Sequence, residues 1–363
     1  MSVVSARRVF GSNGWVEDAS VEITDGWIET VSAGGDRPGH AYLIPAYVDL
    51  QVTGFRDIDL ATTPPSGWSR IGDELAGHGV TSWLPTLVSR PLAEYPRWLE
   101  GAAQVMSLQN PGVARILGVH LEGPWLGSRA GAHLDLAAGS VNVNWIKELP
   151  NHVKVVTLAP ERSGALDAID ELRALNIVAA LGHTDADHQT ATAAFDQGAT
   201  LLTHCFNANP PLHHRSPGIL GAALARDDVF VSLIADGVHV HPDVIRITIR
   251  AKGPDRVALI SDASGWERGV LGSQPTQLID GAPRLADGSL AGSAITLDQA
   301  VRFVVNHCGI SLHDAVRSAS TVPANIINRP DLGRIEPGAR ADVVALDEQL
   351  RVSAVWMDGI RVR

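Results

Sequence analysis

Eight short apolar runs recur along this chain of 363 residues, and most of them are separated by segments with helical character. The runs span residues 42–50, 81–88, 115–122, 153–160, 177–184, 200–206, 229–236 and 257–263. The helical segments include residues 67–78, 91–106, 165–175, 185–197 and 242–250. Near-continuous apolar strands that alternate with helices are typical of a parallel sheet covered by helices. Eight of them predict an α/β fold closed into a (β/α)₈ barrel. An open doubly wound sheet is the alternative, but no glycine-rich fingerprint follows the first run.

The two ends of the chain have a different character from its middle. Residues 1–40 contain short alternating segments separated by Asp-Gly, and residues 333–363 contain further short segments with Pro-Gly and Asp-Gly turns. Such patterns are typical of hairpins. We therefore expect both termini to form one small β-sandwich domain, split between residues 1–40 and 333–363, with the barrel at residues 41–332.

Composition narrows the class of protein. Hydrophobic residues make up 45% of the chain, and the formal net charge is −11. An acidic chain is a poor candidate for nucleic-acid binding, although a few local cations can still hold a phosphorylated small molecule. No apolar stretch reaches the roughly 18 residues that span a bilayer, and the first residues lack the apolar run of a signal peptide. With only two cysteines, Cys205 and Cys308, we expect a cytoplasmic protein without membrane partners.

Polar side chains stand at the carboxyl ends of four of the apolar runs: Glu122, His183, His204 and Asp262. In a barrel these ends meet at one rim, which hosts the active site. One carboxylate and two imidazoles suit a catalytic divalent metal such as zinc, and the separate Asp262 suits a general base. Taken singly, His204 could be a histidine of the hydrophobic core, and Asp262 could be a carboxylate of a turn. Four such residues at equivalent positions make that reading improbable. Asp185 is expected to cap the helix that follows His183.

Longer motifs carry a resemblance to a known family. They are GVHLEGPWL (118–126), GAH (131–133), VTLAPE (156–161), LGHTDA (181–186), THCFNANPPLHHRSPGILGAAL (203–224), IADGVHVHP (234–242), LISDAS (259–264), LAGSAITLDQAVR (290–302) and GRIEPGARADVVALD (333–347). In this order they resemble the N-acetylglucosamine-6-phosphate deacetylases of the amidohydrolase superfamily, and they cover most of the chain from residue 41 onwards.

The resemblance implies a role for each matching residue. Glu122, His183 and His204 would be the metal ligands, Asp262 the catalytic acid and base, and His133 the group that polarises the acetyl carbonyl. The remaining implied contacts are with the substrate phosphate. Asn207 and Ala208 would bind it, and Arg215 and His239 would hold the phosphate of the substrate in the neighbouring subunit, because members of this family are dimers with shared sites. The expected reaction is hydrolysis of the acetamide of N-acetylglucosamine-6-phosphate in amino sugar catabolism.

Two departures from the family pattern leave alternatives open. Many superfamily members have His-x-His at the end of the first barrel strand, whereas Gln51 and Thr53 stand there in this chain. Neither is a good zinc ligand, so one metal per subunit is expected, with Gln51 near the metal-bound water. The loops that follow Gly54 and Ala263 are unusual and are expected near the sugar. The alternatives are another N-acylated amino sugar phosphate, an N-acyl amino acid, or a barrel without catalysis.

Overall fold

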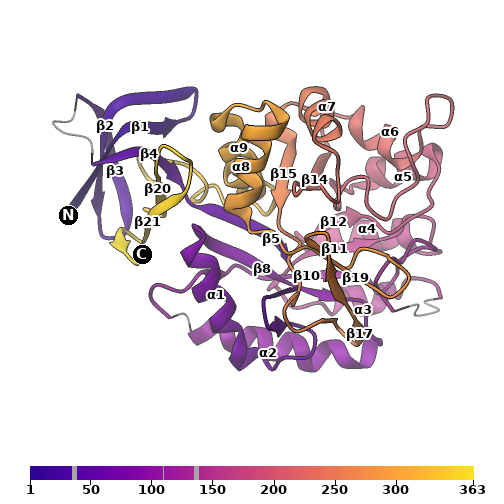
Figure 1. The fold of residues 1–363 in the computed structure, drawn as a ribbon. Coiled ribbons are helices and arrows are strands. Elements are labelled where there is room, and N and C mark those ends of the chain that lie inside the picture. The colour runs from indigo at the N-terminus through magenta and orange to yellow at the C-terminus, as the bar shows by residue number, and fades with distance from the viewer. Residues whose placement is uncertain (35–38, 109, 135–138) are drawn as a thin grey trace.

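Eight parallel strands form the centre of the molecule (Figure 1). The computed structural model describes residues 1–34, 39–108, 110–134 and 139–363. The barrel strands, in spatial order, are β5 (Tyr47–Val52), β8 (Val80–Val88), β10 (Val119–Glu122), β11 (Val153–Leu158), β12 (Val178–Leu181), β13 (Leu201–Leu202), β14 (Phe230–Ile234) and β15 (Val257–Ile260), and the short β9 (Arg115–Ile116) also pairs with β8. Every neighbouring pair is parallel. The predicted barrel is confirmed.

The last barrel strand returns to the first one. The backbone N–H of Asp262 donates to the carbonyl of Gln51 at 2.9 Å, and the N–H of Thr53 donates to the carbonyl of Ala263 at 2.8 Å. These bonds lie at the carboxyl end of the seam between β15 and β5, where Val52 also forms a bridge with Ala263. The chain segment after β15 is therefore held directly beside the end of β5.

The first predicted strand is divided between two sheets. β4 (His40–Pro45) pairs with a terminal strand, whereas the barrel strand begins two residues later at Tyr47. Strand β4 ends at Pro45, which has no N–H to donate, and the N–H of Ala46 makes one more bond to the same neighbouring segment, to the carbonyl of Asp342 at 3.0 Å. We therefore propose that the small domain includes β4 and that its first boundary lies at Pro45 rather than at residue 40.

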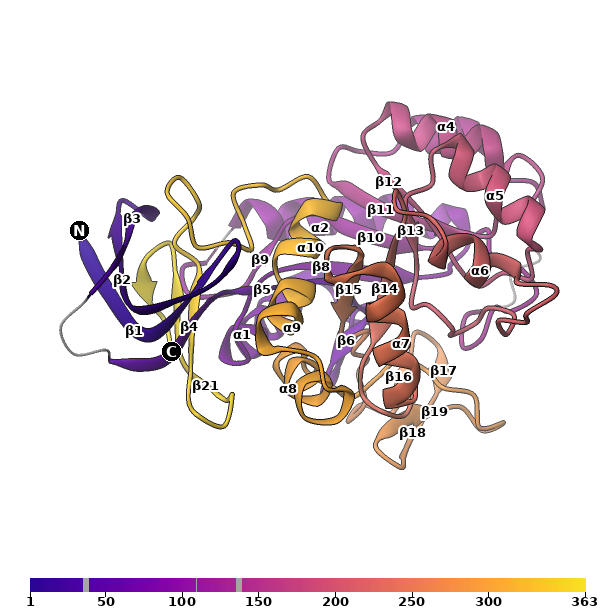
Figure 2. The ribbon, with the colours of Figure 1, turned by 90° about the horizontal axis from the view of Figure 1, so that it is seen from above.

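Both chain ends lie in one seven-stranded sheet beside the barrel (Figures 1 and 2). Its order is β22 (Ile360–Arg361), β21 (Val352–Met357), β20 (Val343–Leu346), β4, β1 (Ser2–Gly11), β2 (Gly14–Thr24) and β3 (Trp27–Ala33). The N–H of Ile28 donates to Ala339 at 2.8 Å, and the N–H of Gly338 donates to Ile28 at 2.9 Å. The edge of β3 thus meets the segment that leads into β20, so the sheet folds back over its own core.

Helices follow most of the barrel strands. The α-helices are α1 (Trp68–Gly77), α2 (Tyr95–Leu108), α3 (Val143–Lys147), α4 (Ala165–Ala174), α5 (His188–Gln197), α6 (Gly218–Leu224), α7 (Pro242–Lys252), α8 (Leu297–Cys308), α9 (Leu312–Ala319) and α10 (Thr321–Ile326). α8 and α9 lie between the small sheet and β15 (Figures 1 and 2), and His313 Nε2 of α9 lies 2.8 Å from the carbonyl of Gly11. In the described ranges, no helix combines the length and the apolar character that a membrane span requires.

The predicted cap of α5 was wrong by two residues. Asp187 is the cap, and its carboxylate accepts from the N–H of Thr190 at 2.8 Å. The carboxylate of Asp185 is instead engaged by the side chains of Ser128 and Arg129. The helix therefore starts later, and Asp185 ties the loop after β12 to the loop after β10.

Short hairpins lie in the segments that follow β5 and β15 at the carboxyl end of the barrel. They are β6 (Gly54–Phe55) with β7 (Ile58–Asp59), β16 (Val270–Leu271) with β17 (Gln274–Pro275), and β18 (Gln277–Ile279) with β19 (Ala282–Arg284). The N–H of Gly272 donates to the buried carboxylate of Asp59 at 2.8 Å. This bond fastens the turn after β16 to the hairpin after β5, so two segments far apart in sequence close one side of the barrel mouth.

Candidate active site

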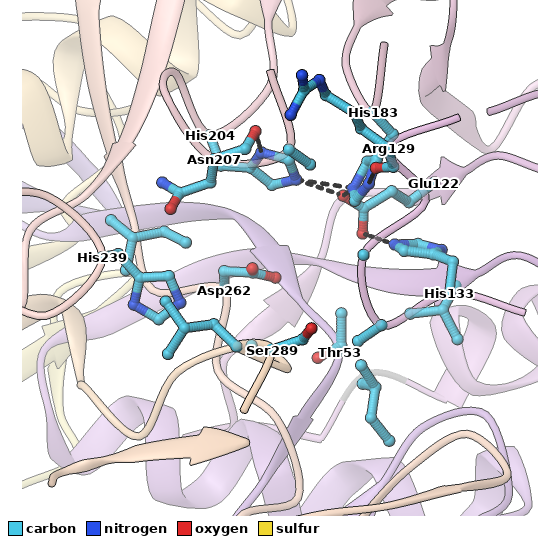
Figure 3. Close-up of a pocket in the computed structure, with 18 of the residues that line it drawn as sticks. Thr53, Glu122, Arg129, His133, His183, His204, Asn207, His239, Asp262 and Ser289 are labelled. Atoms are coloured by element: carbon cyan, nitrogen blue, oxygen red, sulfur yellow. Dashed lines mark hydrogen bonds and ion pairs between the residues drawn. The ribbon is translucent and has the colours of Figure 1, made fainter. Parts of the chain in front are cut away.

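A cavity of about 500 Å³ lies at the carboxyl ends of the barrel strands (Figure 3). Every predicted site residue except Arg215 lines it. Among the residues that the structure describes, the lining consists of Thr53, Val88, Glu122, Ser128, Arg129, Gly131, Ala132, His133, His183, His204, Asn207, Ala208, Ile234, His239, Asp262, Leu271, Ser289, Leu290 and Gly292. These residues come from many different strand ends and loops, as expected for the active rim of a barrel.

Several buried side chains converge on the carboxylate of Glu122, the last residue of β10. Its Oε1 lies 3.1 Å from His183 Nε2 and 2.9 Å from His204 Nε2, and it also accepts from the Nε2 amide of Gln51 at 2.9 Å. The two imidazole Nε2 atoms are 3.0 Å apart. All of these side chains are buried. Two imidazoles and one carboxylate therefore converge on one point, as the sequence predicted.

Backbone carbonyls fix the orientation of both rings. His183 Nδ1 lies 3.0 Å from the carbonyl oxygen of Arg129, and His204 Nδ1 lies 3.2 Å from that of Asn207. A carbonyl only accepts, so each Nδ1 carries the hydrogen, and in a neutral ring the Nε2 lone pair then faces Glu122. This donor set of two nitrogens and one oxygen fits a divalent cation such as zinc.

The electrostatics of the three groups agree with that fit. Burial on its own raises the pKa of Glu122, but the neighbouring His133 and hydrogen bonds from His183 and His204 outweigh it and hold the pKa well below its usual range. Burial lowers the pKa of His183 to about 4. At His204, burial also lowers the pKa, but the hydrogen bond and charge of Glu122 outweigh it and raise the pKa overall. Glu122 thus favours positive charge at this point.

His133 has the opposite tautomer. Its Nδ1 accepts from the backbone N–H of Ser89 at 3.1 Å, so in the neutral ring the hydrogen is on Nε2, which lies 3.5 Å from Glu122 Oε2. The ligand atoms of Glu122, His133 and His183 also lie within 4.8 Å of one another. The hydrogen on Nε2 nevertheless makes His133 a hydrogen-bond donor toward the cavity rather than a metal ligand.

Asp262 lies two residues beyond β15 and lines the same cavity. Burial and then the negative charge of Glu122 raise the pKa of Asp262 well above its usual range. A carboxyl group with a raised pKa can exchange protons with a reacting molecule near neutral pH. In Figure 3 it lies between His133 on one side and His239 on the other.

The backbone is strained where these side chains turn into the cavity. His183, His204 and Asp262 have φ values of 50°, 30° and 48°. This left-handed region is uncommon for residues other than glycine and costs of order 1–3 kcal/mol each. Such strain clusters at functional sites, where the surrounding structure holds the side chains in place.

Comparison with known proteins agrees with this geometry. The model of the amidohydrolase family matches residues 74–362. The chain belongs to the amidohydrolase family. This amidohydrolase is 37% identical to N-acetylgalactosamine-6-phosphate deacetylase of Escherichia coli O157:H7, with 98% of each chain covered. It is 35% identical to N-acetylglucosamine-6-phosphate deacetylase of Vibrio furnissii, covering 98% of this chain and 93% of that enzyme.

Solved structures of deacetylases also resemble this amidohydrolase over nearly its whole length. N-acetylglucosamine-6-phosphate deacetylase of Thermotoga maritima superposes with a TM-score of 0.93 at 31% identity, covering 100% of this chain and 99% of that chain. An aspartate-to-alanine mutant of the Mycobacterium smegmatis deacetylase, in complex with N-acetyl-D-glucosamine-6-phosphate, superposes with a TM-score of 0.92 at 32% identity, covering 99% and 98%.

The side of the amidohydrolase cavity opposite His133 contains Asn207 and His239 (Figure 3). The amide nitrogen of Asn207 is buried and has no hydrogen-bond partner within the described structure. His239 Nδ1 lies 2.6 Å from Asp236 Oδ2. Burial raises the pKa of Asp236, but the hydrogen bond and the charge of His239 outweigh burial and lower the pKa overall. Ala208 also lines the cavity. This side therefore offers donors to an anionic group of a ligand.

Arg215 lies outside the cavity of its own chain. It belongs to an exposed segment, residues 211–216, and its Nη1 lies 2.9 Å from His214 Nε2. Its predicted contact with the phosphate in a neighbouring subunit stays a prediction. His213 and His214 are also exposed, and neither belongs to the described cavity lining.

Sequence reasoning missed several residues of the lining. Arg129 lies in the loop between Glu122 and His133, where its carbonyl holds His183 and its side chain pairs with Asp185. No sequence pattern marks it, apart from its place between two predicted site residues. Leu271, Ser289 and Leu290 come from the segment between β15 and α8. The 290–302 motif could have indicated Leu290.

The two unusual loops, which are expected near the sugar, lie beside each other at the carboxyl end of the barrel. The rings of Phe55 and Trp266 are 4.9 Å apart, and the N–H of Glu267 donates to the carbonyl of Arg56 at 2.8 Å. The loops after β5 and β15 therefore pack against each other. Neither aromatic side chain is part of the described cavity lining. Gly54 and Gly265 allow the two backbones to approach closely, because a Cβ atom at Gly54 would lie 2.7 Å from the backbone nitrogen of Gly265.

Proposed function

We propose that this amidohydrolase removes the acetyl group of N-acetylglucosamine 6-phosphate, producing glucosamine 6-phosphate and acetate in amino sugar catabolism. The observation that carries the proposal is the convergence of Glu122, His183 and His204 on one point of a cavity that also contains Asp262. Relatives and solved structures that cover nearly the whole chain have this activity in their names.

Glu122, His183 and His204 would hold one divalent cation per subunit, which we propose to be zinc. When bound, such a cation polarises a carbonyl group and lowers the pKa of a coordinated water. Gln51 and Thr53 occupy the place of a second pair of ligands, and neutral amide and hydroxyl groups are poor zinc ligands. Gln51 instead donates to Glu122, so we propose a single-metal site.

His133 and Asp262 would carry the proton chemistry. His133 presents its Nε2–H to the acetyl carbonyl oxygen and stabilises the negative charge that develops there. Asp262 accepts a proton from the attacking water and returns it to the amine nitrogen as the C–N bond breaks. The raised pKa of Asp262 supports the first transfer, because a more basic carboxylate accepts a proton from water more readily.

The phosphate would bind at the side of the cavity opposite His133. Asn207, through its unpartnered amide nitrogen, and Ala208 would contact it, with His239 beside them. His239 lines the cavity of its own chain, and this position supports a contact with phosphate in its own subunit rather than in the neighbouring one. Arg215, on an exposed segment outside that cavity, would reach the phosphate in the neighbouring subunit of a homodimer.

A second candidate substrate is N-acetylgalactosamine 6-phosphate. A relative that is 37% identical over nearly the full length has this deacetylase activity in its name. The two sugars differ only in the configuration of one hydroxyl group, so the same metal site and the same acid and base would serve both. The choice between them depends on side chains around the sugar ring.

We also infer a cytoplasmic location. Cys205 and Cys308 are both free and buried, as expected for a protein of a reducing compartment. A phosphorylated sugar would be available there as substrate.

Acetate release and metal content, measured on the same purified protein, test the function. The substrates are the 6-phosphates of N-acetylglucosamine and N-acetylgalactosamine, unphosphorylated N-acetylglucosamine, and an N-acetyl amino acid. We expect turnover on a 6-phosphate and about one metal per chain, as a three-ligand site implies. Preference for the galactosamine derivative would select the second candidate. A metal-loaded protein that hydrolyses neither 6-phosphate would contradict the proposal.

A further inference from the structure

An apolar wall stands beside His133 in the cavity. It consists of Val88, Ala132 and Leu271, which cluster with Ala291. Val88 is the last residue of β8, Ala132 directly precedes His133, and Leu271 comes from β16. All three are at least nine-tenths buried. An apolar surface this close to polar catalytic groups suits a small apolar part of a ligand.

The same wall separates the main cavity from a second one. The second cavity has a volume of about 140 Å³, and Val88, Ala132, His133 and Leu271 line it as well. Its remaining lining is mostly polar and includes Arg90, Glu94 and Gln274. Removing atoms from the wall would therefore join the two spaces.

The geometry of an amide directs one substituent toward this wall. The carbonyl carbon has three substituents in one plane. In the proposed reaction its oxygen faces His133 Nε2, and its nitrogen faces Asp262. The sugar phosphate lies beyond the nitrogen, on the side of the cavity where Figure 3 shows His239. We place the third substituent on the side away from His239, at the apolar surface next to His133. That substituent is the acyl chain.

We propose that Val88, Ala132 and Leu271 form the acyl-binding site and limit the acyl group to the two carbons of acetyl. This inference rests on the proposed function and defines its acyl specificity. Each additional methylene would have to displace a buried side chain. In a packed pocket one methylene changes specificity by roughly 10–200-fold.

The wall is held in place by contacts behind it. The N–H of Gly272, next to Leu271, donates to Asp59 at 2.8 Å, and this carboxylate also accepts from the N–H of Thr62 at 2.9 Å. A Cβ atom added to Gly272 would lie 3.5 Å from Val88 Cγ2. The turn after β16 thus rests against the end of β8, so Leu271 has little freedom to move aside for a longer chain.

The test compares N-acetyl, N-propionyl and N-butyryl glucosamine 6-phosphate as substrates of the metal-loaded enzyme. The wild type should lose roughly 10–200-fold in kcat/KM from acetyl to propionyl. Leu271→Ala should reduce that ratio at least tenfold, because the second cavity becomes accessible. Val88→Ala changes the same wall at a residue of a barrel strand. This second variant replaces Leu271→Ala in the test if Leu271→Ala folds poorly. Leu278→Ala, on an exposed side chain of β18 outside both cavities, should keep the wild-type ratio.

The outcomes separate this inference from the function on which it rests. A wild type that hydrolyses propionyl and acetyl substrates equally well would overturn the acyl site. So would wall variants that lower kcat/KM for all three substrates by the same factor. If the galactosamine series is preferred, the same acyl ratios apply to it. Metal-loaded protein that hydrolyses no acetyl substrate of either series would reject the proposed function and this inference together.

Discussion

The Nε2 atoms of His183 and His204 lie 3.0 Å apart and face the same oxygen of Glu122. Because the carbonyls of Arg129 and Asn207 hold both Nδ1 hydrogens, neutral rings bring two lone pairs together at this separation. Lone pairs so close repel each other unless they share a positive charge. The fold therefore orients three ligand atoms for a cation through groups that do not themselves touch it.

Replacing either histidine should remove the metal. Loss of a supporting group behind a ligand typically costs 10–100-fold in metal affinity, so we expect His183→Ala or His204→Ala to cost more than that. The measurement is metal content after dialysis against a weak chelator, together with acetate release. His188→Ala provides the control, because this histidine is exposed at the start of α5. Full metal content in both site variants would contradict the ligand assignment.

Asp262→Asn should separate chemistry from metal binding. Its side chain lines the cavity without belonging to the three-ligand set, so metal content should be unchanged. Loss of a general acid and base lowers turnover by about 10²–10⁴-fold. Steady-state kinetics and metal analysis of the same preparation give both readouts. Near-normal turnover would show that another group carries the protons.

Arg215→Ala should weaken binding of phosphorylated substrates only. A hydrogen bond to a charged group is worth about 1.5–3 kcal/mol, so KM should rise roughly 10- to 100-fold while unphosphorylated substrates are unaffected. Arg250→Ala, an exposed arginine of α7, should behave as wild type.

Mixed dimers test whether Arg215 acts across subunits. Chains with Arg215→Ala and chains with Asp262→Asn are each expected to be impaired on the phosphorylated substrate. In a mixed dimer, one site would combine an intact Asp262 with the intact Arg215 of the other chain. Co-expression should then restore activity. Mixtures that stay as inactive as their components would place Arg215 in its own subunit's site or outside the reaction.

Asp49 should make stability fall as pH rises. Burial raises its pKa to about 6; its Oδ1 accepts from the N–H groups of Gln51 and Ser261 at 3.3 Å, and its Oδ2 has no partner in the described structure. The folded state then binds a proton that the unfolded state releases near pH 4, so this contribution is complete below pH 4 and is lost as pH rises through about 6.

Asp49→Asn keeps an acceptor for both N–H groups and removes the titration. Denaturant unfolding of both proteins between pH 4 and pH 7 gives the difference in free energy of unfolding. We expect the wild type to lose stability relative to the variant across this range, by at most about 3 kcal/mol for a shift of this size. A difference that is independent of pH would show that Asp49 does not titrate as described.

The barrel and the residues at its strand ends could be read from the sequence. Glu122, His183, His204 and Asp262 each follow a buried apolar run, and parallel strands in a barrel bring those ends to one rim. His133, Asn207 and Ala208 came from family resemblance and also line the cavity. The barrel and the positions of these side chains could be predicted because they depend on local patterns and on one rule of barrel geometry, while the roles of the side chains stay predictions.

Only the tertiary structure decided how these residues are oriented and what surrounds them. Ser89 sets the tautomer of His133 from 44 positions away, and the carbonyl of Arg129 orients His183 from 54 positions away. Leu271 reaches the cavity because Gly272 is bonded to Asp59, 213 positions distant. Such contacts leave no periodic signature in the chain, because each depends on the path of two loops that meet only after the barrel has closed.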